Sequence, residues 1–148
     1  MRKGKKRAFT GFGVFLLIML IGSIFFYLNF KTIEVSGPSM NPTFKSGDRV
    51  LVSKAYWLVG PIKDKDIVVL HDPGGPGNII KRVYRLGGED VDFKWMPDSA
   101  KITNAPYKVP DGCIYVLGDN RPVSEDSRKF GPVDLSKVLG KVIILGKK

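Results

Sequence analysis

Residues 8–30, AFTGFGVFLLIMLIGSIFFYLNF, form an apolar stretch without a single charged side chain. At about 1.5 Å per residue, a helix of this length spans roughly 34 Å, enough to cross a hydrocarbon core of about 30 Å. Residues 1–7 before it contain five positive residues and no acidic residue. We therefore predict a basic segment over residues 1–7, followed by a transmembrane helix over residues 8–30.

Two other interpretations of this stretch are a cleavable signal peptide and a helix buried in a protein core. A signal peptide has a shorter apolar core, of roughly 7–15 residues, and ends in small residues at its cleavage site. Here the stretch ends in the bulky sequence FFYLNF, so we expect an uncleaved anchor. Because the positive residues precede the span, we expect the amino terminus in the cytoplasm and residues 31–148 outside the cell membrane.

Residues 31–148 are long enough to form one domain. They hold 19 of the 24 basic residues and all 14 acidic residues, a net charge of +5. This excess suits an anionic membrane surface, whereas no basic stripe interleaved with aromatic residues indicates nucleic-acid binding. The chain has one cysteine, Cys113, and one histidine, His71. An intrachain disulfide and a zinc site of the usual Cys/His type are therefore excluded, and Cys113 is expected to be a small packed residue.

Short apolar segments alternate with turn sequences after the anchor. They are rich in Val and Ile and are separated by Gly, Pro, Asp and Ser at spacings typical of a mainly β domain. The predicted strands cover residues 31–35, 49–54, 66–70, 78–86, 113–117 and 141–145. Only residues 134–139 favour a helical turn. Two tryptophan segments, at residues 57–59 and 95–97, are expected either at the bilayer surface or in the core.

A single histidine leaves few routes to an activated serine. His71 lies beside Asp72 in a turn rich in Pro and Gly, where an exposed loop histidine is a better interpretation than a Ser-His-Asp triad. A lysine can act as the base instead if burial lowers its pKa below the usual value of about 10.4. Lys81 fits, because strand alternation places it on one face with Ile79 and Val83. The alternative is an edge-strand lysine that points to water.

The candidate nucleophile is Ser39, in the sequence SGPSMNPT over residues 36–43. The flanking Gly and Pro residues favour a rigid turn directly after a strand. Such a turn can expose the hydroxyl and leave the Ser39 N–H free to stabilise an oxyanion. An ordinary loop serine remains the alternative on this pattern alone.

Several blocks, in order, resemble type I signal peptidases. SGPSMNPT is similar to the nucleophile segment of that family, S-G-x-S-M-x-P-T, and residues 118–128 closely match its block G-D-N-R-x-x-S-x-D-S-R. The full set of matching blocks is SGPSMNPT (36–43), GDRV (47–50), DIVV (66–69), KRV (81–83), GDNRPVSEDSR (118–128) and FGPV (130–133). The resemblance covers residues 33–133 and implies an antiparallel β domain with a hydrophobic cleft, preceded by one anchor helix.

The resemblance also implies roles for individual residues. Ser39 would be the nucleophile, Lys81 the general base, and Ser124 a hydrogen-bond partner that orients Lys81. The remaining supporting residues would be an ion pair and a nearby carboxylate: Asp126, Arg128 and Asp119. The implied reaction is cleavage of signal peptides from secreted precursors after small-x-small sequences, without metal or cofactor. The implied partners are these precursors and the lipid bilayer, and not nucleic acid.

One departure from the family pattern affects the oxyanion hole. Gly37 stands where some members have a serine whose hydroxyl assists, so only the Ser39 N–H can be assigned. A lysine at position 81, and only 36 residues between it and the Gly118 block, indicate the compact bacterial form. Two rival interpretations are a self-cleaving Ser-Lys protease of the repressor type, which the anchor argues against, and an anchored binding module without activity.

Overall fold

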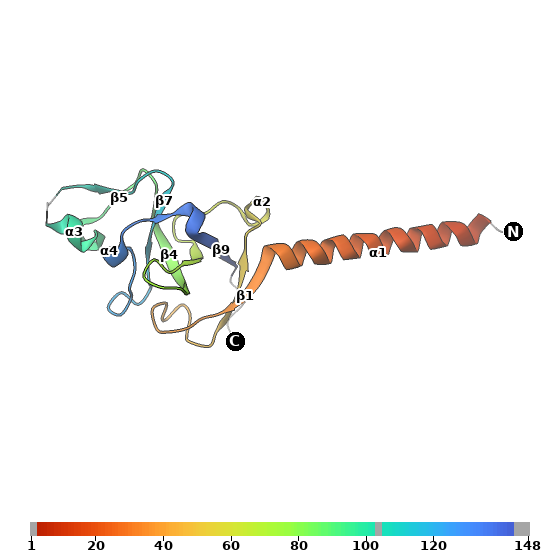
Figure 1. The fold of residues 1–148 in the computed structure, drawn as a ribbon, viewed down its shortest axis with the longest axis horizontal. Helices are drawn as coiled ribbons and strands as arrows, with labels where there is room; N and C mark the ends of the chain where they lie inside the picture. The colour runs from red at the N-terminus through yellow and green to blue at the C-terminus, as the bar shows by residue number, and fades with distance from the viewer. Residues whose placement is uncertain (1–2, 103–104, 144–148) are drawn as a thin grey trace.

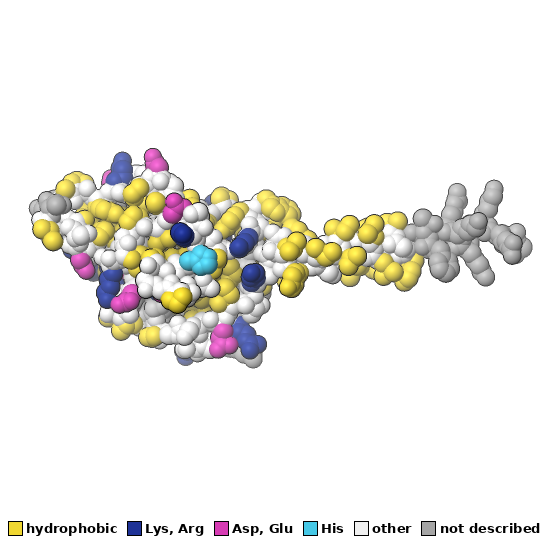
Figure 2. All heavy atoms as spheres, viewed as in Figure 1, with side chains coloured by type: hydrophobic (Ala, Val, Ile, Leu, Met, Phe, Trp, Pro, Cys, Tyr) yellow, Lys and Arg dark blue, Asp and Glu magenta, His cyan; other side chains and the backbone are white. Residues whose placement is uncertain are grey.

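The computed structural model describes residues 3–102 and 105–143 of the 148-residue chain. Its first element, α1 (Lys3–Asn29), projects away from the rest of the molecule as one long helix (Figure 1). The segment Gly11–Asn29 is long and apolar enough to cross a membrane, and none of it is buried against the protein. Figure 2 shows hydrophobic side chains along the described part of this helix. Such an unburied apolar helix needs an apolar surrounding other than this protein's own core.

The remaining chain is built on antiparallel strands. Its main sheet has seven strands in the order β1-β2-β9-β3-β4-β7-β8, and every pairing in it is antiparallel. These strands are β1 (Phe30–Glu34), β2 (Arg49–Ser53), β3 (Ile67–His71), β4 (Asn78–Leu86), β7 (Cys113–Leu117), β8 (Val133–Asp134) and β9 (Val138–Ile143). A two-stranded sheet pairs β5 (Asp90–Val91) with β6 (Tyr107–Lys108). The expected fold class, a mainly antiparallel β domain after one helix, is confirmed.

Short helices connect these strands. They are α2 (Tyr56–Val59), α3 (Asp98–Lys101), α4 (Ser127–Phe130) and the 3-10 turns η1 (Phe93–Trp95) and η2 (Leu135–Lys137). The predicted helical turn over residues 134–139 is thus helical only at η2, because residue 138 already begins β9. The end of the predicted strand 141–145 lies partly outside the described residues, as do residues 1–2 of the basic segment.

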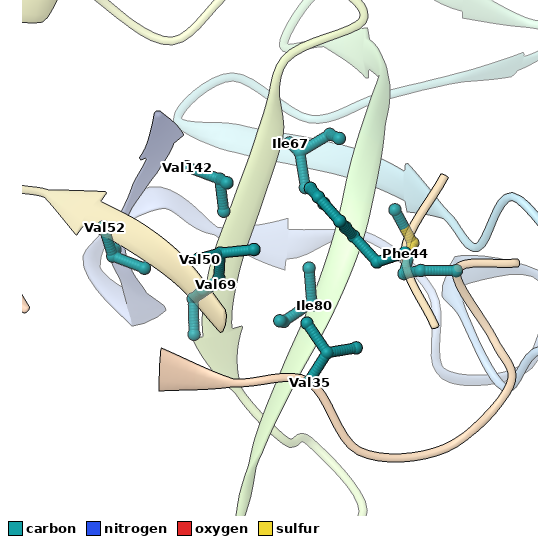
Figure 3. Close-up of a cluster of buried hydrophobic side chains, with 9 residues drawn as sticks. Val35, Phe44, Val50, Val52, Ile67, Val69, Ile80 and Val142 are labelled. Carbon is teal, nitrogen blue, oxygen red and sulfur yellow. The ribbon is translucent and has the colours of Figure 1, made fainter. Parts of the chain in front are cut away.

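Buried clusters cover both faces of the central strands β3 and β4. On one face a cluster of nine residues from β2, β3, β4, β9 and the connection after β1 forms a core (Figure 3). It consists of Val35, Met40, Phe44, Val50, Val52, Ile67, Val69, Ile80 and Val142. On the other face β3, β4, β7 and β8 contribute Val68, Leu70, Val83, Ile114, Val116 and Val133. The central strands are therefore fixed from both sides, which makes them a rigid base for the side chains that they carry.

Candidate active site

Ser39 lies in the connection between β1 and β2, and its turn is held by the core. Met40, the next residue, is 1% exposed, and Phe44 is also buried in the first cluster. The Phe44 N–H donates to the Met40 carbonyl at 2.9 Å, which closes the turn. Gly37 has a φ of +83°, in the left-handed region that glycine adopts without strain. The turn thus presents Ser39, half-buried, on a well-anchored backbone.

Lys81 reaches Ser39 from the middle of β4. Its Nζ donates a hydrogen bond to Ser39 Oγ at 3.1 Å, although 42 positions separate the two residues. Lys81 is directly opposite Val68 of β3, and it is 3% exposed. Burial lowers the pKa of the Lys81 amine, and the negative charges of Asp126, Asp72 and Glu125 oppose this only partly. The buried setting therefore favours the neutral amine, which is the form that can accept a proton.

Ser124 is buried close to this pair, and its hydroxyl helps to lower the pKa of Asp126 without reaching the geometry of a full hydrogen bond. Its Oγ has no hydrogen-bond partner among residues 3–102 and 105–143. The expected hydrogen bond from Ser124 to Lys81 is therefore not formed in this structure. Ser124 instead lies against Gly118: a Cβ built on Gly118 would be 2.0 Å from Ser124 Oγ and 2.7 Å from the Ser39 carbonyl oxygen.

Asp126 and Arg128 form a close, two-pronged ion pair. Arg128 Nε lies 2.8 Å from Asp126 Oδ1, and Arg128 Nη2 lies 2.9 Å from Oδ2. The Asp126 side chain is fully buried and also accepts the Gly118 N–H at 3.0 Å. Burial acts to raise the pKa of Asp126, but the hydrogen bonds from Arg128 and Gly118 outweigh it, so the pKa is lowered. Asp126 is thus a buried carboxylate that holds the Gly118 backbone in place.

Asp119 has a partner that the sequence analysis missed. Its Oδ1 accepts Arg82 Nε at 2.8 Å, and its Oδ2 accepts Arg82 Nη2 at 2.6 Å and Thr43 Oγ1 at 2.5 Å. Arg82 follows Lys81 on β4 and projects to the opposite face of the strand. Thr43 belongs to the same turn as Ser39. The group therefore ties three segments together: the nucleophile turn, β4 and the loop after β7.

A small pocket opens beside Ser39 and Lys81. Its volume is about 90 Å³. It is lined by Ile33, Glu34, Val35, Ser36, Ser39, Met40, Val69, Asn78, Ile79, Ile80 and Lys81. A larger hollow of about 430 Å³ includes charged residues of β4 but neither Ser39 nor Lys81. The smaller pocket has both apolar and polar walls and contacts both reactive groups, so it is the better candidate for binding a substrate side chain.

Metal-ligating side chains do not gather in the described part of the chain. Within residues 3–102 and 105–143, no group of three or more His, Cys, Asp or Glu residues is placed to hold a metal ion. His71 is exposed at the end of β3, and Cys113 is half-buried at the start of β7.

Comparison with known proteins places these features in a family. The chain matches the family model described as signal peptidase, peptidase S26, over residues 7–103 and 94–145. Signal peptidase I of Bacillus caldolyticus is 31% identical over 96% of this chain and 92% of that protein. Signal peptidase IB of Staphylococcus aureus is 29% identical over 86% of this chain and 81% of that protein. A crystal structure of a signal peptidase I from Enterococcus faecalis covers 56% of this chain and 97% of that chain, with a TM-score of 0.45 and 26% identity.

A β domain that brings a serine hydroxyl to a buried amine, behind an apolar amino-terminal helix, is consistent with an anchored peptidase. The family match and the Bacillus caldolyticus relative go further: the chain belongs to the signal peptidase family, peptidase S26. The resemblance to type I signal peptidases drawn from the sequence blocks is confirmed. The apolar helix α1 is compatible with the membrane anchoring expected of such a protein.

Proposed function

We propose that this chain cleaves signal peptides from secreted precursor proteins, with Ser39 as the nucleophile and Lys81 as the general base. The observation that carries the proposal is the 3.1 Å hydrogen bond between Lys81 Nζ and Ser39 Oγ, made by a lysine that is 3% exposed. A buried amine at this distance is suited to removing the serine proton. Membership of the signal peptidase family supports the same assignment.

The proposed reaction has two stages. Neutral Lys81 accepts the Ser39 proton while Oγ attacks the scissile carbonyl carbon, and the resulting oxyanion is stabilised by the Ser39 N–H. Collapse of this intermediate breaks the C–N bond, and the Lys81 ammonium returns its proton to the leaving amine. Water, deprotonated by Lys81, then hydrolyses the ester and restores the Ser39 hydroxyl.

The size of the pocket supports a preference for small side chains. A volume of about 90 Å³ accommodates an alanine-sized group more readily than a large side chain. The apolar residues Ile33, Val69 and Ile79 form part of its lining, so the group it accepts is expected to be apolar as well. We therefore infer cleavage after small-x-small sequences.

The anchor supports a membrane-bound site of action. Lys3, Lys5 and the other basic residues at the amino terminus are expected to stay in the cytoplasm, with residues 31–148 outside. Near the end of α1, the ring of Trp57 lies 5.6 Å from that of Phe25, and Trp57 is 76% exposed. This tryptophan is therefore not a core residue. We place it at the bilayer interface, beside the end of the anchor.

The deciding experiment is processing of a precursor that carries an Ala-x-Ala site by the full chain in detergent, with the cut mapped. Ser39→Ala and Lys81→Ala are each expected to abolish cleavage, because the two groups act as one unit. Ser99→Ala and Lys137→Ala, which change exposed residues of the same types, are the matched controls and should cleave normally. Processing by Lys81→Ala at neutral pH would overturn the assignment. Folded wild-type protein that binds a precursor without cutting it would favour the anchored binding module.

The orientation is tested separately. In intact cells without a wall, added protease should digest residues beyond 31 and leave an amino-terminal tag intact. A protected carboxy-terminal domain would contradict the proposed site of action.

A further inference from the structure

Asn120, which the roles assigned above leave unused, makes two hydrogen bonds to the turn that carries Ser39. Its backbone N–H donates to the Ser39 carbonyl at 2.9 Å, and its side-chain Nδ2 donates to the Pro38 carbonyl at 3.1 Å. These two carbonyls belong to the peptide units immediately before and after the Cα of Ser39. Asn120 therefore contacts both peptide units that flank the nucleophile, from 82 positions away in the sequence.

The contact with Pro38 bears on the Ser39 N–H. The Pro38 carbonyl and the Ser39 N–H are the two ends of one peptide unit, which is planar and trans, so they point in opposite directions. A donor fixed on the carbonyl oxygen therefore also fixes the direction of the N–H. The Asn41 N–H donates to the same Pro38 oxygen at 3.0 Å. Hydrogen bonds on the carbonyl also polarise the peptide, which strengthens its N–H as a donor.

The Ser39 N–H itself is available. Within the described part of the chain it donates to no acceptor. Its neighbours offer no obvious replacement: Pro38 has no N–H, residue 37 is a glycine without a hydroxyl, and the Gly37 N–H already points to Ser46 Oγ at 3.4 Å. Among the described residues, the Ser39 N–H is thus a free backbone donor at the nucleophile itself, and its direction depends on what holds the Pro38 carbonyl.

We infer that the Asn120 side chain is a positioning residue, which aims the Ser39 N–H at the oxyanion by holding the carbonyl at the other end of the same peptide. This inference rests on the proposed function, in which Ser39 is the nucleophile. Asn120 bonds the two carbonyls and not Ser39 Oγ or Lys81 Nζ, so it acts through the peptide rather than on the reacting groups. Its effect is confined to the stage at which the oxyanion forms. The Ser39 N–H binds the negatively charged oxygen of the transition state more strongly than the neutral carbonyl oxygen of the bound substrate.

The test compares Asn120→Ala and Asn120→Asp with the wild type, as full chains in detergent. Both variants keep the backbone N–H that binds Ser39 and remove the side-chain donor that binds Pro38; the aspartate also keeps the size of the side chain. We expect kcat/KM to fall about 10- to 100-fold with KM nearly unchanged, less than or comparable to the loss on deleting an oxyanion donor outright. Val123→Ala, an exposed change in the same loop, is the matched control and should behave as wild type.

Two ligands distinguish a misdirected Ser39 N–H from a general loss of structure or of substrate binding. A peptide aldehyde, to whose carbonyl Ser39 Oγ adds to give a tetrahedral adduct, should bind more weakly by the same factor as kcat/KM falls. An uncleavable peptide with proline after the scissile site should bind as tightly as to the wild type. The pH at which the rate rises should also stay constant, since Lys81 is untouched. Equal losses for both ligands, or a kcat/KM within twofold of wild type, would overturn the inference.

The proposed function is checked in the same experiment. If Ser39→Ala is inactive while both Asn120 variants cleave normally, only the role of Asn120 is wrong. If Ser39→Ala cleaves, the proposed nucleophile itself is wrong.

Discussion

Gly118 lies so close to Ser124 that residue 118 has no room for a side chain. A Cβ there would be 2.0 Å from Ser124 Oγ and 2.5 Å from Ser124 Cβ, and also 2.7 Å from the carbonyl oxygen of Ser39. The Ser124 side chain is buried and the Ser39 oxygen belongs to the backbone, so neither can move away freely. The site can therefore keep this shape only if residue 118 is a glycine, whose side chain is a single hydrogen atom.

Gly118→Ala is accordingly expected to shift the Ser39 turn and to lower kcat strongly, by about 100-fold, because small displacements from the attack geometry are costly. Overpacking of this kind also destabilises by roughly 1–3 kcal/mol. The measurements are kcat and thermal melting of the full chain. Gly77→Ala is the control, since a Cβ there meets nothing within 4 Å. A Gly118→Ala enzyme with normal kcat would mean that Ser39 does not need the observed backbone position.

The rate should depend on pH through Lys81. Because burial lowers the pKa of this amine below its usual 10.5, the neutral base becomes available at lower pH than for an exposed lysine. We expect kcat/KM to rise with pH through that lowered pKa and then to level off. The measurement is a pH profile on a soluble peptide substrate, whose own ionisable groups are blocked. A flat profile from pH 6 to pH 10 would show that Lys81 is not the base.

Ser124→Ala tests the orientation of Lys81. The resemblance to type I signal peptidases implies a hydrogen bond between the two, whereas in the structure Ser124 Oγ is buried without a full hydrogen bond among the described residues. If the hydroxyl turns to Lys81 only during the reaction, kcat should fall about 10- to 1000-fold. The fall in melting temperature should be small beside that of Asp126→Asn, because the Ser124 hydroxyl makes only a minor contribution to holding the Asp126 carboxylate. Full activity of the variant would leave Ser124 with no role in catalysis.

Asp126→Asn is expected to act on stability. The carboxylate is fully buried and bound by Arg128 and the Gly118 N–H, so removing its charge leaves Arg128 without its counter-ion. We expect a loss of about 3–5 kcal/mol at pH 7, measured by chemical unfolding of the detergent-solubilised chain. Glu125→Gln, which breaks the exposed pair with Lys129, is the control and should cost less than about 1 kcal/mol.

The same pair has a defined pH dependence. Because the pKa of Asp126 is lower in the folded than in the unfolded chain, its stabilisation is complete above the unfolded value of about 3.9. It is lost as the pH falls through the folded-state pKa. The difference in stability between wild type and Asp126→Asn should therefore shrink below about pH 4. A difference that stays constant to pH 2 would contradict the lowered pKa.

The two tryptophans allow the bilayer contact to be measured in one protein. Trp57 is 76% exposed beside Phe25 of the anchor, whereas Trp95 is half-buried, within cation–π distance of Arg121 and Arg128. In vesicles of brominated lipid, the fluorescence of the Trp95→Phe variant, which retains Trp57, should be quenched. The Trp57→Phe variant, which retains Trp95, should be quenched much less. Equal quenching of the two would remove Trp57 from the interface.

The strands were predictable where a run of Val and Ile is bounded by turn residues. Strands β4 and β7 have the predicted bounds, and β1, β2 and β3 differ by one residue at one or both ends. Helices α2 and α4 were missed because an element of four residues is about one turn, too short to show a 3.6-residue period. Strands β5 and β6 were missed because two residues cannot show alternation, and only their pairing defines them.

In the site, local motifs were informative and long-range partners were not. A turn and a strand pattern made Ser39 and Lys81 candidates, and the family resemblance gave them their roles; the structure brings them within hydrogen-bond distance. The partner of Asp119 was not predicted, because Arg82 is 37 positions away and appears from sequence as an ordinary strand cation. Neither alternation nor turn chemistry states which distant side chain a carboxylate meets. That information exists only once the sheet order is known.

The join between anchor and sheet has one more consequence. Helix α1 ends at Asn29 and β1 begins at Phe30, and the Asn29 carbonyl accepts the Lys54 N–H at 3.0 Å. No linker residue separates the two elements, and this hydrogen bond joins the end of the helix to the segment that follows β2. With α1 across a bilayer, Ser39 would be held at a set height above the lipid. The distance of a scissile bond from the membrane surface would then help to determine whether it is cleaved, in addition to the side chains beside it.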